Sequence, residues 1–291
     1  MSDTLTYVTA YRQDNGLRAS LNALAGEAFG IDFEPWYRQG HWDDHYAPHS
    51  LVAGGRVVAN VSATTMTLLW QGVPRRAVQL GTVVTAPEYR GRGLAADLMA
   101  RVLARYRTEC DFLFLFAHEG VTGFYPRFGF EPVGESRFVA SVVPGGQPMP
   151  LLQLNLENDE DGRLVERLVR TRQPVSQTLS ALGSDGLLRF HLLNSFPQAL
   201  WYAPEEDCLL VCEYQSDTLQ LHDVLCSHAV DLPRLMPSIL PDGVTRVEFG
   251  FTPDWPVESM RIGPLTDNGT LFLLPSVAMA RPFRFPITAQ A

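Results

Sequence analysis

The chain has 291 residues, of which 46% are hydrophobic and 19% are charged, and its formal net charge is −9. This composition is typical of a folded globular protein, and the acidic balance argues against a nucleic-acid partner, because such binding needs a basic surface. All 23 basic residues are arginines. Pyridoxal enzymes, P-loop NTPases and protein kinases each depend on a lysine, so the sequence excludes these three classes.

Hydropathy along the chain gives no sign of a membrane segment. The N-terminal residues lack the basic and apolar regions of a signal peptide. The longest apolar runs, such as 112–117, are far shorter than the ~20 residues that span a bilayer. We therefore expect a cytoplasmic protein without a membrane partner.

The spacing of the cysteines also indicates a cytoplasmic protein. Cys208 and Cys212 lie four residues apart in a predicted strand, which places their sulfurs roughly 13 Å apart. This separation is too large for a disulfide or a shared metal ion. We expect buried free thiols, as in a reducing compartment.

A segment rich in Pro and Gly divides the chain near its middle. Residues 1–145 carry 13 arginines and 14 acidic residues, whereas residues 146–291 carry 10 arginines and 18 acidic residues. Together with the length, this predicts a first domain over 1–143, a linker over 144–150 and a second domain over 151–291.

Hydrophobic periodicity predicts mixed α/β domains. The first domain is expected to contain helices at 17–28, 34–39 and from 94 onward, a further helix after 117, and strands at 50–53, 56–70, 76–85, 112–117 and 137–143. The second domain repeats much of this order, which suggests a duplicated fold. Its helices are expected near 164–168, 187–193 and 232–240, and its strands at 208–214, 218–225 and 245–251.

The most informative segment connects the strand 76–85 to the helix that begins at Leu94. It carries Arg90, Gly91, Arg92 and Gly93 in a tight turn. Backbone amides in such a turn, together with the positive end of the helix, form a site for a pyrophosphate, and the glycines let the backbone approach closely. The alternative is an ordinary connection with exposed arginines.

Two signatures resemble the GNAT family of acetyl-CoA-dependent N-acyltransferases. Arg90-Gly-Arg-Gly93-Leu-Ala95 follows Val84-Thr-Ala-Pro87 and matches the family's cofactor turn, Gln/Arg-x-x-Gly-x-Gly/Ala. Phe124-Tyr-Pro-Arg-Phe-Gly-Phe130 matches its aromatic-Tyr-x-x-x-Gly-Phe motif. The resemblance covers residues 5–143 and extends more faintly to tandem, Eis-like proteins. It implies an α/β mixed-sheet GNAT fold with a second, degenerate GNAT-like lobe.

The resemblance also implies roles for individual residues. The backbone of Val83, Val84 and Thr85 would pair with the pantetheine arm of acetyl-CoA like an added strand, and an amide there would stabilise the oxyanion. Tyr125 would protonate the departing thiolate, unless it is only a packed core aromatic. The pyrophosphate would be held by Arg90, Gly91, Arg92, Gly93, Leu94 and Ala95. Gly81 is a candidate for the bulge that opens the strand.

The chain departs from the family pattern where a proton acceptor is needed. Many members have Asn seven residues before the motif tyrosine, and this chain has His118, either a proton acceptor or a hydrogen-bonded substitute for Asn. The strand before the turn offers no carboxylate. The base is therefore His118, a carboxylate elsewhere, a water chain or bulk solvent.

The segment 32–46 lies where this fold places the wall for the acceptor substrate. Asp32, Trp36 and Trp42 are candidate contacts for a cationic amine, through charge pairing and cation–π interaction. The alternative is an aromatic-rich cap over the helices. Histidines also recur every four residues near this segment, but a Gly and a Pro weaken the helix that would align them, so we expect no metal site.

These observations together predict an N-acetyltransferase that moves an acetyl group from acetyl-CoA to a small primary amine by direct attack. The second half lacks the cofactor turn and is expected to bind no CoA; its charge of −8 either steers cationic substrates or aids solubility. The alternative function is a non-catalytic acyl-CoA-binding or regulatory module. A homo-oligomer is left open.

Overall fold

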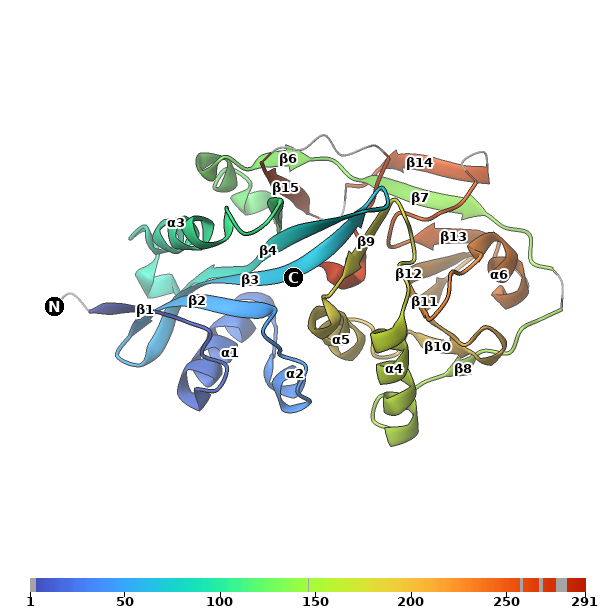
Figure 1. The fold of residues 1–291 in the computed structure, drawn as a ribbon, viewed down its shortest axis with the longest axis horizontal. Coiled ribbons are helices and arrows are strands. Elements are labelled where there is room, and N and C mark those ends of the chain that lie inside the picture. The colour runs from blue at the N-terminus through green and yellow to red at the C-terminus, as the bar shows by residue number, and fades with distance from the viewer. Residues whose placement is uncertain (1–3, 146, 257–258, 267–268, 276–281) are drawn as a thin grey trace.

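The computed structural model describes residues 4–145, 147–256, 259–266, 269–275 and 282–291. The molecule consists of two twisted β-sheets that lie side by side, each covered by helices on both faces (Figure 1). No helix in these ranges is long and apolar enough to cross a bilayer.

The first sheet is built mainly from the N-terminal half of the chain. Its strand order is β1 (Leu5–Thr9), β2 (Tyr46–Ala53), β3 (Arg56–Trp70), β4 (Val73–Thr85), β5 (Phe112–Ala117), β15 (Thr270–Leu274) and β6 (Glu131–Val133), and β9 (Leu179–Leu182) pairs with β3. Along this order only β4 and β5 run parallel, because the helix between them carries the chain back across the sheet. One face packs against α3 (Leu94–Tyr106), and the other against α1 (Asn15–Phe29) and α2 (Glu34–Arg38).

The second sheet has the same plan. Its strand order is β8 (Leu152–Gln153), β10 (Leu200–Ala203), β11 (Cys208–Gln215), β12 (Thr218–Cys226), β13 (Arg246–Phe249), β7 (Ser136–Ser141) and β14 (Met260–Pro264). The parallel pair is β12 and β13, joined through α6 (Leu232–Ile239). The helices α4 (Asp159–Thr171) and α5 (Asp185–Asn194) cover the opposite face.

The two sheets correspond strand by strand. In each, the fourth and fifth strands are the parallel pair, and the sixth and seventh strands run antiparallel to their neighbours. This correspondence agrees with the duplicated fold that the sequence suggests.

Each half of the chain supplies the sixth strand of the other half's sheet. Strand β7 follows β6 in the sequence but pairs with β13 and β14, whereas β15 follows β14 but pairs with β5 and β6. The strand predicted at 137–143 therefore exists but lies in the second sheet. The sheets do not follow the predicted split at 144–150, of which Gly146 lies outside the described residues, and the boundaries of the two folding units stay a prediction.

The structure differs from the sequence prediction most in short elements. The helix expected after residue 117 is replaced by two 3-10 turns, η2 (Glu119–Val121) and η3 (Tyr125–Phe128). Short edge strands such as β1 and β6 were not predicted, because their pairing is set by a distant partner strand rather than by local periodicity. The long helices and central strands lie where the periodicity places them.

Candidate active site

The strands β4 and β5 separate part-way along the first sheet. Their ladder contains only the pairs from Ala77↔Phe112 to Gln79↔Phe114. Beyond Gln79, β4 continues to Thr85 with β3 as its ladder partner among the described residues. The other edge of residues 80–84 therefore lacks a ladder partner among the described residues, and pairing of Val83, Val84 and Thr85 with an extended ligand stays a prediction.

A β-bulge lies at the point of separation. The register between β3 and β4 shifts between the pairs Asn60↔Val84 and Ser62↔Gly81, and Thr82 has a left-handed φ of 46°. A non-glycine residue in this region is strained and needs support from its surroundings. The bulge predicted at Gly81 is thus centred on the next residue.

A buried polar network supports this bulge. Asn60 is fully buried, and its Nδ2 donates to the carbonyl of Thr82 at 2.9 Å and to Ser62 Oγ at 2.9 Å. Its Oδ1 accepts from Ser50 Oγ at 2.8 Å, and Ser50 Oγ lies 2.6 Å from the hydroxyl of Tyr11. The Asn60 amide thereby supplies the partner that the interrupted ladder denies to the Thr82 carbonyl.

The turn after β4 has a left-handed backbone at both of its glycines. Gly91 and Gly93 have φ values of 74° and 77°, a region in which other residues are strained. Gly93 is the N-cap of α3, and because it has no side chain, no side-chain hydrogen bond caps the helix. The first amides of α3, from Leu94 and Ala95 onward, therefore remain available to an anion.

The two arginines of the turn are exposed and partly ordered by the backbone. Arg90 donates from Nε to the carbonyl of Thr85 at 3.2 Å, and Arg92 donates from Nη2 to the carbonyl of Glu88 at 3.0 Å. The Arg92 guanidinium also lies over the ring of Tyr89, 4.7 Å from its centre. Both cations thus lie beside the open amides, where a pyrophosphate would need them.

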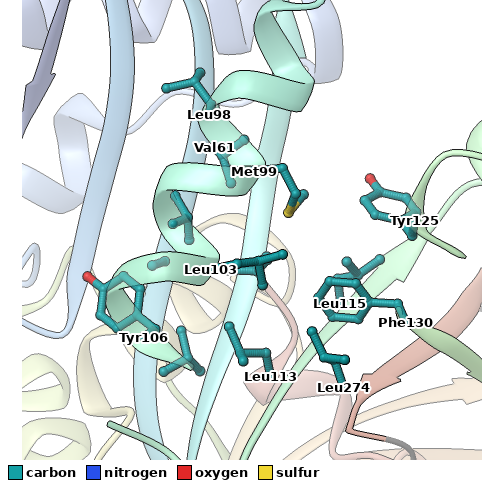
Figure 2. Packing of buried hydrophobic residues seen from close by; sticks show 14 of the residues in the cluster. Val61, Leu98, Met99, Leu103, Tyr106, Leu113, Leu115, Tyr125, Phe130 and Leu274 are labelled. Carbon is teal, nitrogen blue, oxygen red and sulfur yellow. The ribbon is translucent and has the colours of Figure 1, made fainter. Parts of the chain in front are cut away.

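Tyr125 lies in the core beneath α3, beside the opened part of the sheet. Its ring packs against Phe124, Phe130 and Phe272, with centres 5.2, 6.4 and 5.6 Å apart. Figure 2 shows its hydroxyl pointing away from Leu115 and Phe130. Burial raises the pKa of this phenol above its usual value of 10.0, and the hydroxyl has no hydrogen-bond partner among the residues that the structure places. A protonated phenol without a partner is suited to donate a proton.

Phe272 is a neighbour of Tyr125 that no motif in the sequence indicates. It lies in β15, pairs in register with Leu115, and reaches Tyr125 from the far end of the chain. Leu115 is the first residue of β5 after its ladder with β4 ends. The exchanged strand therefore holds the predicted acid next to the point where the sheet opens.

The last described residues also reach this site. The carbonyl of Ala291 accepts from Gln79 Nε2 at 3.4 Å, and a Cβ added to Gly81 would lie 2.9 Å from the carbonyl carbon of Ala291. The preceding residue Gln290 is held by His191, whose Nε2 lies 2.5 Å from the Gln290 carbonyl. Gly81 therefore allows the close approach of a second segment, which no local pattern in the sequence indicates.

His118 lies at the end of β5, where it is exposed and begins η2. Its ring makes no hydrogen bond to the described part of the chain. The structure thus places it free of the hydrogen bonds that a buried Asn substitute would make. Its role as a proton acceptor stays a prediction.

The three candidate acceptor contacts have different surroundings. Trp36 and Trp42 are 2% and 3% exposed, and Trp36 Nε1 donates to the carbonyl of Gly186 at 2.7 Å. The two rings stack on one another, and Trp36 also packs against Phe190 of α5, so Trp36 joins α2 to the second half of the chain. Asp32 is exposed and accepts from the amide of Glu34. Contact of the two tryptophans with a substrate stays a prediction, and their burial argues for the alternative of an aromatic cap.

The histidines that recur every four residues do not share a helix. His49 lies in β2, whereas His41 and His45 lie in the loop before it. His49 hydrogen-bonds to the hydroxyl of Tyr7 at 2.6 Å, and burial lowers its pKa to about 4. No group of three or more metal-ligating side chains occurs in the parts of the chain that the structure covers.

Part of the chain matches a known protein family. Residues 17–133 match the family described as the acetyltransferase (GNAT) domain. The chain carries a GNAT N-acetyltransferase domain. This domain contains the opened strands, the glycine turn and Tyr125. Among curated proteins, no sequence matches the chain.

Solved structures show that the whole two-sheet fold recurs. A conserved protein of unknown function from Enterococcus faecalis is 14% identical and superposes with a TM-score of 0.62 over 93% of this chain and 72% of its own. Eis1 from Mycobacterium abscessus is 14% identical, with a TM-score of 0.59 over 93% and 73%. A GNAT acetyltransferase from Kribbella flavida is 19% identical, with a TM-score of 0.57 over 93% and 71%. At these identities the likeness shows a shared fold, with the GNAT domain followed by a second lobe of the same plan.

Proposed function

We propose that the GNAT domain transfers an acetyl group from acetyl-CoA to a primary amine. The observation that carries this proposal is the continuity of two binding features: the open edge of β4 runs directly into the uncapped turn at Gly91 and Gly93. The edge can pair with the amides of a pantetheine arm, and the turn can hold a pyrophosphate. This spacing of an extended arm and a diphosphate is what CoA presents.

The chemical step requires a proton donor and a proton acceptor. The amine nitrogen attacks the thioester carbon, the carbon–sulfur bond breaks, and the thiolate takes a proton from the Tyr125 phenol. A backbone amide at Val83 or Val84 on the open edge is suited to stabilise the oxyanion. His118 is the candidate acceptor of the amine proton, because its exposed ring has no competing partner among the described residues.

The acceptor is proposed to be a small amine with positive charge elsewhere in the molecule. The support is electrostatic, since the second half carries a net charge of −8 and the chain as a whole −9. A cationic acceptor would be attracted to such a protein at low ionic strength.

The proposal is tested by measuring both binding and turnover. Acetyl-CoA should raise the melting temperature of the protein, and a panel of polyamines, aminoglycosides and amino acids should include one that yields CoA and an acetylated product, followed by mass spectrometry. The chain has no lysine side chain that acetyl-CoA could modify, so background from self-acetylation is small. Stabilisation without turnover on any amine would instead indicate an acyl-CoA-binding module.

The role of His118 is tested by two substitutions. His118→Asn keeps hydrogen-bonding capacity but cannot accept the proton, whereas His118→Ala removes both. A proton acceptor predicts that both variants lose activity near neutral pH. Full activity of His118→Asn would show that the residue only substitutes for Asn.

A further inference from the structure

Two cysteines of the second lobe lie directly opposite one another. The ladder between β11 and β12 pairs Cys208 with Cys226, and both side chains belong to the same buried cluster. Both residues are at most 2% exposed, and both thiols are free. Directly paired residues of antiparallel strands have Cα atoms about 4.5–5.5 Å apart, which lies within the 4.4–6.8 Å that a disulfide requires.

The surroundings of the two sulfurs are not alike. Cys226 ends β12, and its Sγ lies 3.3 Å from Nδ1 and 3.4 Å from Nε2 of His228, an exposed residue in the loop that leads to α6. The interaction between the two facing thiols lowers the pKa of Cys226 and raises that of Cys208. The backbone of His228 lowers the pKa of Cys226 further. Cys226 therefore has the donors that stabilise a thiolate.

The other two cysteines lack such donors. Burial raises the pKa of Cys110 to about 11 and that of Cys212 to about 12. Cys212 lies on the same strand as Cys208 and in the same cluster, but it pairs with Leu221 instead of a cysteine. It is thus a matched internal control for burial without a partner.

We propose that Cys208 and Cys226 are a peroxide-sensitive dithiol that closes to a cross-strand disulfide, with Cys226 as the attacking residue and His228 as its positioning residue. The Cys226 thiolate attacks one oxygen of a hydroperoxide and becomes a sulfenic acid, and the other oxygen leaves as water or an alcohol after protonation. The Cys208 thiol then attacks the sulfenic sulfur, the disulfide forms, and a second water leaves. In sum, two thiols are oxidised to one disulfide, and one hydroperoxide is reduced. This proposal is independent of acetyl transfer.

The test is peptide mapping of the intact protein after treatment with hydrogen peroxide. Remaining thiols are blocked, and cleavage after glutamate separates the peptide 207–213, which carries Cys208 and Cys212, from the peptide 214–248, which carries Cys226. We expect these two peptides to be joined without reductant and to separate with it. The same linkage in the Cys212→Ala variant assigns it to Cys208.

Two further measurements separate reactivity from folding. In the untreated protein, iodoacetamide should label Cys226 faster than Cys110 or Cys212. The His228→Ala variant should slow that labelling by about tenfold, whereas Ser227→Ala should not, and circular dichroism verifies that both variants are folded. A linkage that involves Cys212, an unlinked sulfinic acid at Cys226, or equal labelling of all four cysteines would each overturn the proposal.

Discussion

The two lobes follow one plan, but the connections after their fourth strands do opposite things. In the first lobe, Gly93 caps α3 without a side chain, so the first amides of the helix stay open. In the second lobe, the side chain of Asp231 caps α6 and accepts from the amide of Arg234 at 3.2 Å. Pro233 also removes one of the early N–H groups of α6. A negatively charged cap opposes a phosphate at this position, so we expect capping chemistry, more than the fold, to decide which lobe binds CoA.

The strands of the parallel pair separate in both lobes. In the second sheet, the ladder of β12 and β13 ends at the pair Leu221↔Phe249, and the amide of Gly250 closes it by donating to the carbonyl of Leu221 at 2.7 Å. Beyond Leu221, β12 has β11 as its ladder partner among the described residues, just as β4 has β3 beyond Gln79. The chemistry of the turn and the helix cap, rather than the strand gap, therefore distinguishes the two lobes.

The largest expected effect comes from giving the first turn a side chain and a negative charge. Gly93→Glu should weaken acetyl-CoA binding by about 100-fold or more, because the residue has a left-handed φ and the carboxylate would repel the pyrophosphate. Calorimetric titration measures this. The matched control is Gly72→Glu, at a hairpin glycine with a φ of 72° and open space around it, which should leave binding unchanged.

Removal of the predicted acid should affect turnover rather than binding. Tyr125→Phe should lower kcat by roughly 100-fold while the KM for acetyl-CoA stays within about twofold. Because burial raises the pKa of Tyr125, the phenol stays protonated through neutral pH, and any rate loss from its ionisation should appear only above about pH 10. Steady-state kinetics from pH 6 to 10.5 would test this. An unchanged kcat in the variant would remove Tyr125 from the chemistry.

A smaller effect should follow from loss of the support beneath the bulge. Asn60→Leu leaves the Thr82 carbonyl without its donor, so we expect a loss of about 1–3 kcal/mol in the free energy of unfolding and a KM for acetyl-CoA raised by about tenfold. The control is Thr64→Val on the same strand, since the Thr64 hydroxyl is buried and has no hydrogen-bond partner in the described structure. Equal KM values for the two variants would contradict a positioning role for Asn60.

A last effect leaves the cofactor site untouched: it concerns acid stability and tests whether the two lobes unfold together. Burial lowers the pKa of His49 in the first lobe and of His191 in the second to about 4. Their folded pKa values lie below the unfolded value of 6.5, so the unfolded chain binds more protons between pH 6.5 and 4, and stability falls across this window as pH falls. Each residue contributes up to about 3 kcal/mol to that loss.

Denaturant titrations of His49→Gln and His191→Gln at pH 7 and pH 4.5 should each show a shallower pH dependence. Because β7 and β15 are exchanged between the sheets, we expect both substitutions to act on one unfolding transition. Two transitions, each sensitive to only one substitution, would show that the lobes unfold independently despite the exchange.

The parts of the site that could be predicted from sequence are those that depend on neighbours along the chain. Gly91, Gly93 and the motif around Tyr125 act through local backbone and chain order, so their positions in the structure agree with the motif. Phe272 and Ala291 reach the site through pairing across more than 150 residues, for which no local pattern exists.

Two other differences have the same origin. Trp36 and Trp42 lie in an aromatic segment that suits a substrate wall, but both are buried, and α5 from the second half of the chain packs against Trp36. Spacing along one strand correctly separates Cys208 from Cys212, yet the partner of Cys208 lies on the neighbouring strand. Register between strands is set by the packed sheet, so sequence spacing alone could not bring these side chains together.

Native mass spectrometry tests most directly whether only one of the two equivalent turns binds acetyl-CoA. Titration of the wild-type chain with acetyl-CoA should saturate at one molecule per chain, and the Gly93→Glu variant should bind none at the same concentrations. Saturation at two molecules per chain, or a bound molecule that persists in Gly93→Glu, would contradict binding at the first turn alone.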